Sequence, residues 1–86
     1  MDTIRISWTL RGEAETAYVV NGEPVGGGFE AILEIIRQNP LAQIILELGP
    51  MAGGGGRSVR SMLPFSSRYA EFAEALGGRD AVMEMQ

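Results

Sequence analysis

The sequence contains no cysteine and no histidine among its 86 residues. Without cysteine the chain forms no disulfide bond and offers neither a thiolate nucleophile nor a thiolate ligand for a metal. Without histidine it lacks the commonest general base and the commonest ligand of zinc, copper and iron, which leaves only oxygen-ligated metals such as Mg²⁺ or Ca²⁺. We therefore expect no catalytic residues, no cofactor and no metal site.

Lysine is absent as well, so all seven basic residues are arginines. Arginine suits bidentate recognition of phosphate or carboxylate, but a genome rich in G and C gives the same bias without selection for binding. We favour the compositional explanation.

Long hydrophobic runs are also missing. No apolar segment approaches the roughly 20 residues that a membrane span requires. The first residues, MDTIRISW, begin with an acid and alternate, whereas a signal peptide has a basic start followed by an apolar run. We expect a cytoplasmic protein without membrane contact.

The composition nevertheless predicts a packed core. Hydrophobic residues make up 45% of the chain and its net charge is −4, whereas disordered chains combine low hydrophobicity with high net charge. A chain of this length is one domain that buries about 60–65% of the surface of its unfolded form. We predict a single globular domain over residues 1–86.

Two strands are indicated in the first quarter of the chain. Residues 3–10 alternate between apolar and polar side chains, which is the period of a strand with one buried face. Residues 15–20 (ETAYVV) are rich in β-branched and aromatic residues, so a hairpin should form, and Asn21-Gly22 should end its second strand.

Helical and strand patterns then alternate. Residues 29–37 carry an apolar stripe that predicts a helix ending before Asn39-Pro40, and residues 42–48 (AQIILEL) predict a central strand covered on both faces. Ser66 or Ser67 should cap a second helix that Gly77 ends. Its inward stripe is expected at Tyr69, Phe72, Ala73 and Leu76. Residues 80–86 suit a last strand with Ala81, Met83 and Met85 inward, or a short helix.

The predicted fold is α+β, with the order β-β-α-β-α-β, a mixed four-stranded sheet and two helices packed on it. The long first strand and the terminal strand are both candidates for a sheet edge that is open to pairing.

A glycine-rich segment at about residues 49–64 is the clearest candidate site. Four consecutive glycines cost much backbone entropy to order, so we expect a mobile loop. Their N–H groups can also converge on an anion, with help from nearby arginines. The candidate anion site consists of Gly53, Gly54, Gly55, Gly56, Arg57, Arg60 and Arg68.

The known phosphate motifs are not matched. A P-loop would need a glycine at Met51 and a lysine at Arg57. A second glycine segment, GEPVGGG, would leave the same end of the sheet as the first if the strands at 15–20 and 42–48 were parallel, and ligands of open α/β sheets bind at that end. A flexible connection is the simpler interpretation of the glycine-rich segment.

Catalysis and nucleic-acid binding have weaker support. Glu47 lies within the most apolar strand and would act as an acid or base if burial raised its pKa, although such a residue usually faces solvent near a strand end. The chain is acidic, and of its aromatic residues only Tyr18, Phe65 and Tyr69 are candidates for exposed stacking. We expect neither function.

Binding to a partner protein fits these absences best. We predict a small non-catalytic interaction module, an adaptor or inhibitor, with the option of pairing with itself through an edge strand. The expected partner-binding residues are Met51, Arg57, Arg60, Met62 and Leu63. The alternative is a phosphate- or nucleotide-binding module that uses the glycine-rich segments with Arg57, Arg60 and Arg68.

Overall fold

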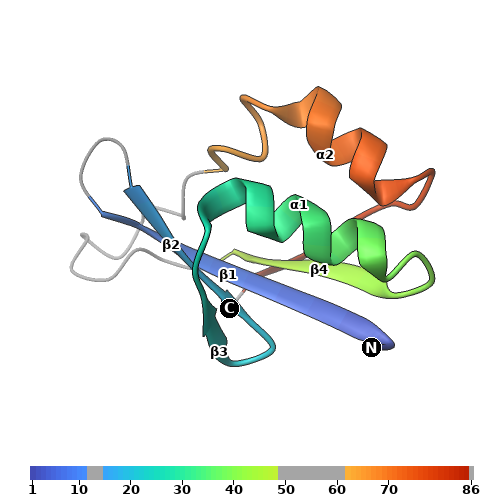
Figure 1. Ribbon diagram of the computed structural model, residues 1–86, viewed down its shortest axis with the longest axis horizontal. Coiled ribbons are helices and arrows are strands. Elements are labelled where there is room, and N and C mark those ends of the chain that lie inside the picture. The colour runs from blue at the N-terminus through green and yellow to red at the C-terminus, as the bar shows by residue number, and fades with distance from the viewer. Residues whose placement is uncertain (12–14, 49–61, 86) are drawn as a thin grey trace.

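The computed structural model describes residues 1–11, 15–48 and 62–85, and within them it shows one sheet with two helices (Figure 1). The elements in chain order are β1 (Thr3–Arg11), β2 (Glu15–Val20), β3 (Glu23–Val25), α1 (Gly28–Gln38), β4 (Gln43–Leu48), α2 (Tyr69–Leu76) and β5 (Val82–Met85). The predicted α+β class, mixed sheet and pair of helices are confirmed. The sheet has five described strands, however, and not four.

The additional strand is β3, which forms a hairpin with β2. Asn21 and Gly22 both have positive φ, at 51° and 85°, as the two-residue type I′ turn requires. Val20 pairs directly with Glu23 across this turn. Proline is rare in central strands because it has no main-chain N–H to donate, but Pro24 is tolerated because β3 lies at the edge of the sheet.

The strand order is β3-β2-β1-β4-β5, and β2 is the one described strand that runs against the others. β1 is antiparallel to β2 and parallel to β4, so it is central and cannot serve as the open edge that its length suggested. β5 pairs in parallel with β4 and forms one edge of the sheet.

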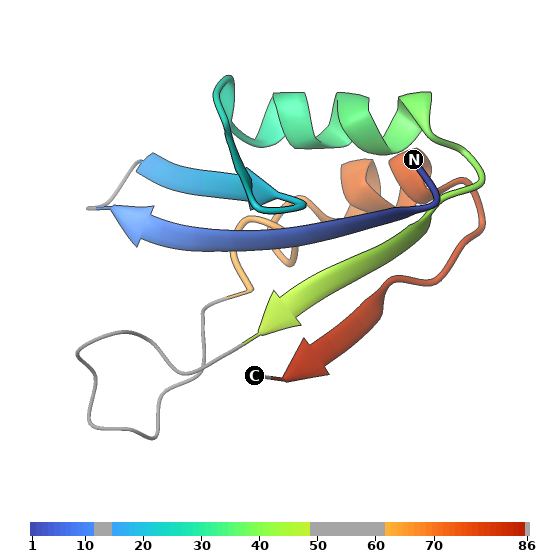
Figure 2. The ribbon, with the colours of Figure 1, turned by 90° about the horizontal axis from the view of Figure 1, so that it is seen from below.

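Both helices cover the same face of the sheet, as Figure 2 shows. The predicted stripe of α1, namely Phe29, Ile32, Leu33 and Ile36, is fully buried. The prediction that β4 is a central strand covered on both faces is confirmed by the burial of Ile44, Ile45 and Leu46, although the helices cover one face only. Ile45 points to the face without helices and is still buried, because Arg5 and Val82 flank it in register.

The second helix begins later than predicted. The residue preceding α2 is Arg68, which makes no capping bond with its side chain, and the Ser67 hydroxyl donates instead to the carbonyl of Pro64. The buried side is Phe72, Ala75 and Leu76, whereas Tyr69 is 62% exposed. The predicted stop at Gly77 is confirmed by its left-handed conformation, with φ 61°.

Phe65 joins the segment before α2 to the core. Its side chain is buried, and its ring centroid lies 4.7 Å from that of Trp8 and 5.1 Å from those of Phe29 and Phe72. Aromatic pairs at these separations attract one another beyond the effect of burial. Phe65 therefore fixes the start of α2 against both the sheet and α1.

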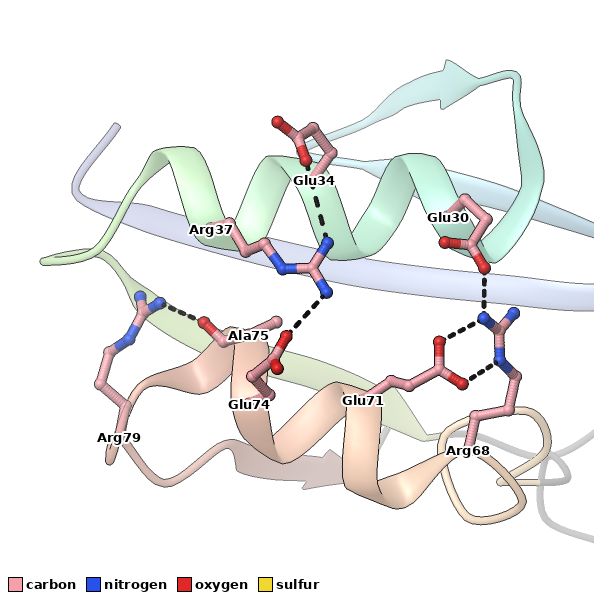
Figure 3. Close-up of polar contacts among 8 residues, drawn as sticks. All are labelled: Glu30, Glu34, Arg37, Arg68, Glu71, Glu74, Ala75 and Arg79. Atoms are coloured by element: carbon pink, nitrogen blue, oxygen red, sulfur yellow. Dashed lines mark hydrogen bonds and ion pairs between the residues drawn. The ribbon is translucent and has the colours of Figure 1, made fainter.

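The two helices are also joined by polar contacts (Figure 3). Arg37 of α1 reaches Glu74 of α2 at 3.1 Å, and Arg68 reaches back to Glu30. Beyond the end of α2, the guanidinium of Arg79 donates to main-chain carbonyls at the ends of both helices. Its acceptors are the carbonyls of Ile36, Asn39, Ala42, Ala75 and Leu76.

Neither described helix is long and apolar enough to cross a membrane.

Candidate functional site

Most of the predicted site lies outside the described residues. Met51, the glycines Gly53, Gly54, Gly55 and Gly56, and the arginines Arg57 and Arg60 fall in the segment 49–61, which the structure does not describe. The predicted mobile loop at about 49–64 falls largely in the same segment. Met62, Leu63 and Arg68 are the predicted site residues that can be placed.

Arg68 lies between two carboxylates. Its Nε donates to Glu71 at 2.9 Å, and its Nη2 contacts both Glu71 and Glu30. The bond to Glu71 and then the bond to Glu30 raise the pKa of Arg68, and the bond from Arg68 lowers the pKa of Glu71. The guanidinium also lies 5.0 Å from the ring centroid of Phe29. A phosphate at Arg68 would have to compete with these two acids.

Met62 and Leu63 differ in exposure. Met62 is partly buried and packs against the core, whereas Leu63 is 48% exposed. Leu63 and Arg68 lie on the wall of one cavity of about 370 Å³. The structure thus brings together one residue from the predicted anion site and one from the predicted docking surface.

The two glycine segments do not follow parallel strands in the way the sequence predicted. β2 is antiparallel to β1, and β1 is parallel to β4, so the strands at 15–20 and 42–48 are not parallel. The intervening strand β3 runs in the same direction as β4, so both glycine segments still follow strands that point the same way. The glycines at 26–28 therefore follow the carboxyl end of a strand for a reason that the sequence argument did not contain.

Glu47 belongs to an ion-pair cluster on the face without helices. Nη1 of Arg5 lies 3.3 Å from Glu47 and also contacts Glu84, and the Glu47 side chain is 22% exposed. Glu84 and, to a smaller extent, Glu47 raise the pKa of Arg5. The cluster joins β1, β4 and β5 across the sheet.

The aromatic residues do not form a platform for nucleic-acid bases. Tyr18 and Phe65, which were candidates for exposed stacking, are buried at 3% and 1% exposure. Burial raises the pKa of Tyr18. Tyr69 is the exposed aromatic residue of the described part of the chain.

The two edges of the sheet differ in their capacity to accept another strand. At one edge, β3 is three residues long and carries Pro24, and both features limit strand addition. At the other edge, β5 has the sequence VMEM, without proline or lysine, and no described strand pairs with its outer side. Of the two predicted edge strands, the terminal one is an edge.

A groove lies between this open edge and α2. It has a volume of about 290 Å³ and is lined by Tyr69, Phe72, Leu76, Arg79, Asp80, Ala81 and Met83. By register, Met83 and Met85 stand beside Leu46 and Leu48, so they face the helix side as predicted. They are nevertheless 51% and 62% exposed. An apolar surface therefore continues from the groove onto the edge strand.

Sequence reasoning assigned no role to this groove. The helical spacing placed Tyr69 in the inward stripe of the second helix, although Tyr69 was also a candidate for exposed stacking, and Met83 and Met85 were expected to face inward if residues 80–86 formed a strand. The spacing of Tyr69 and Phe72 predicts a helix but does not say which face of the helix is buried. That face is set by the packing of Phe72 against Phe65, whose ring centroids are 5.1 Å apart.

The chain matches no protein-family model, no curated protein and no solved structure. Its function is therefore argued from the geometry.

Proposed function

We propose that the protein is a non-catalytic interaction module that binds an extended segment of a partner protein along the outer side of β5. The observation that carries this proposal is the outer edge of β5, with which no described strand pairs, beside a groove that exposes apolar side chains. Exposed edge strands offer a row of main-chain donors and acceptors, and binding domains that work by strand addition use such rows.

The side chains around β5 specify the chemistry of the partner segment. Alternate residues of an added strand would point toward α2, where Tyr69 of α2 and Met83 of β5 offer exposed apolar surface. Methionine is flexible and suits surfaces that adapt to a partner. Asp80 lines the groove and forms no ion pair with any described residue. The expected ligand is an extended peptide with alternating apolar residues and a basic residue at its end near Asp80.

The experiment is a selection of displayed random peptides on the immobilised protein, followed by affinity measurements on the selected peptides. Met83→Lys places a charge on the edge and should weaken binding at least about tenfold. Leu41→Lys is the matched control because Leu41 is 96% exposed and lies in the turn after α1, and it should leave affinity unchanged.

Selected peptides that bind the Met83→Lys protein as tightly as the natural one would refute the proposal. A second copy of this chain is another possible occupant of the edge. A concentration-dependent dimer that Met83→Lys abolishes would assign the edge to self-association in place of a partner peptide.

A further inference from the structure

A second cavity lies at the opposite side of α2 from the β5 edge, and the proposed function makes no use of it. Its volume is about 370 Å³, within the range of about 300–1,000 Å³ typical of small-molecule sites. The wall is formed by Leu10, Thr16, Tyr18, Gly28, Phe29, Leu63, Pro64 and Arg68. These residues come from β1, β2, the start of α1 and the segment that leads into α2.

The lining of this cavity combines apolar side chains with the polar groups of Thr16, Tyr18 and Arg68. Leucine, proline and aromatic side chains make up most of it, and Arg68 is the charged residue among the described lining residues. Two of the lining residues, Tyr18 and Phe29, are packed in the hydrophobic core, and their ring centroids are 6.3 Å apart. This packing holds that part of the wall in place. A concave site that combines apolar walls with a few polar groups is the usual form of a ligand site.

The hydrogen bonds of Arg68 identify the polar group that a ligand should carry. A guanidinium has five N–H donors. Nε and Nη2 donate to Glu71 and Glu30, whereas Nη1 has no acceptor among the described residues. Figure 3 shows the nitrogen without a dashed line on the side of the guanidinium away from Glu71. Two donors are thus available to a ligand oxygen.

The ion pairs of Arg68 with Glu30 and Glu71 also bear on the charge that a ligand should carry. Arg68 contributes one positive charge, and Glu30 and Glu71 contribute two negative charges beside it. An anion would meet this net negative charge, whereas a neutral carbonyl oxygen accepts from Nη1 without that repulsion. The phenol of Tyr18, whose pKa burial raises, adds no negative charge at neutral pH.

We propose that this cavity binds a small neutral molecule with an apolar, preferably aromatic, body and a carbonyl oxygen that accepts hydrogen bonds from Nη1 of Arg68. The site differs in place and in ligand from the β5 edge, so either proposal can fail without the other.

The test is an NMR titration of the full chain with three probes: acetanilide, which is neutral and has a carbonyl; phenylacetate, which is anionic; and toluene, which lacks an acceptor. Fragments of this size bind with Kd values on the order of 1 mM. Acetanilide should shift the amide signals of Thr16, Gly28 and Phe29 in a saturable way and should bind more tightly than either other probe.

Two variants and a control locate the site. Leu63→Trp should fill the cavity and abolish the acetanilide shifts, whereas Leu41→Trp, the same substitution at the turn after α1, should leave them unchanged. Arg68→Lys keeps a positive charge beside Glu30 and Glu71 but removes the forked donors. It should weaken acetanilide binding by a few-fold and leave toluene binding unchanged.

Three results would overturn the proposal. The first is the absence of saturable shifts at these amides up to tens of millimolar acetanilide, a concentration about tenfold above the expected Kd. The second is tighter binding of phenylacetate than of acetanilide. The third is acetanilide binding that survives both Leu63→Trp and Arg68→Lys unchanged.

Discussion

At the scale of single residues, arginines connect parts of the chain that are distant in sequence. Arg79 follows α2, yet it donates to the carbonyls of Asn39 and Ala42 at 2.8 and 2.6 Å. The last carbonyls of a helix have no partner within the helix and need donors from elsewhere. Arg79 supplies such donors to both helices at once, whereas Arg37 forms ion pairs at the protein surface.

We predict that Arg79→Met lowers the free energy of unfolding by about 2 kcal/mol, because several charge-assisted hydrogen bonds are lost while the apolar stem is retained. In a domain of this size the midpoint of thermal unfolding should fall by about 8–16 °C. Arg37→Met is the control and should cost at most about 0.5 kcal/mol. Equal midpoints for the two variants would contradict the role given to Arg79.

The pair formed by Arg68 and Glu71 predicts a pH dependence. Its hydrogen bond lowers the pKa of Glu71 in the folded state below the ordinary value of 4.5. The pair therefore stabilises the fold above that value, and the stabilisation is lost as the pH falls through the lowered pKa.

Thermal unfolding at pH 6 and at pH 2.5 measures this effect. The decrease in midpoint between the two pH values should be smaller in Glu71→Gln and in Arg68→Met than in the natural protein. A decrease of the same size in all three proteins would show that the pair does not contribute.

At the scale of elements, the patterns predicted α1 and β1 well because each has one face in the core. The apolar side chains of both patterns are buried, namely Phe29, Ile32, Leu33 and Ile36 in α1 and Ile4, Ile6 and Trp8 in β1. Sequence periodicity did not predict features that depend on packing against other elements. The rotation of α2 depends on Phe65, and β3 is too short to show a period. Asn21-Gly22 was the available signal for the β2–β3 hairpin.

β5 is weakly buried, and an ion pair on the open face helps to hold it. Arg5 of β1 reaches past β4 to Glu84, and of the residues of β5 none is fully buried. Elements with few buried contacts open more readily than the core. The proposed binding of a partner at β5 agrees with this low burial, because elements that bind ligands are drawn from the less stable parts of a fold.

We predict that Glu84→Gln increases the hydrogen-exchange rates of the β5 amides by a few-fold and leaves those of β1 unchanged, since the charge-assisted bond to Arg5 is weakened. Added salt should produce a similar change in the natural protein. Glu23→Gln, at the other edge of the sheet, is the control because Glu23 forms no ion pair with a described residue. Unchanged β5 exchange in Glu84→Gln would refute the anchoring role.

At the scale of the whole molecule, the described part of the chain forms a sheet with one edge limited by Pro24 and one edge, at β5, that no described strand covers. This arrangement was beyond the reach of sequence patterns, because strand order depends on contacts between distant segments such as β1 and β4. The sequence suited either a strand or a short helix at residues 80–86, and the exposure of the methionines of β5 follows from the position of α2. Most residues of the predicted anion site fall outside the described chain, so that part of the sequence reasoning stays a prediction.

The protection of the β3 edge is itself testable. Pro24→Val restores a main-chain donor on an exposed edge strand and adds a β-branched side chain, so the variant should self-associate more than the natural protein. Sedimentation velocity over a range of concentrations measures the change. Identical sedimentation of the two proteins would show that Pro24 does not protect this edge.

The central claim is that a partner segment binds as an added strand on β5. The most direct measurement is amide hydrogen exchange with and without a selected peptide, resolved by residue. The account predicts new protection of amides in Val82–Met85, with little change in Glu23–Val25 at the other edge. Protection confined to other parts of the chain, with exchange in β5 unchanged, would contradict strand addition.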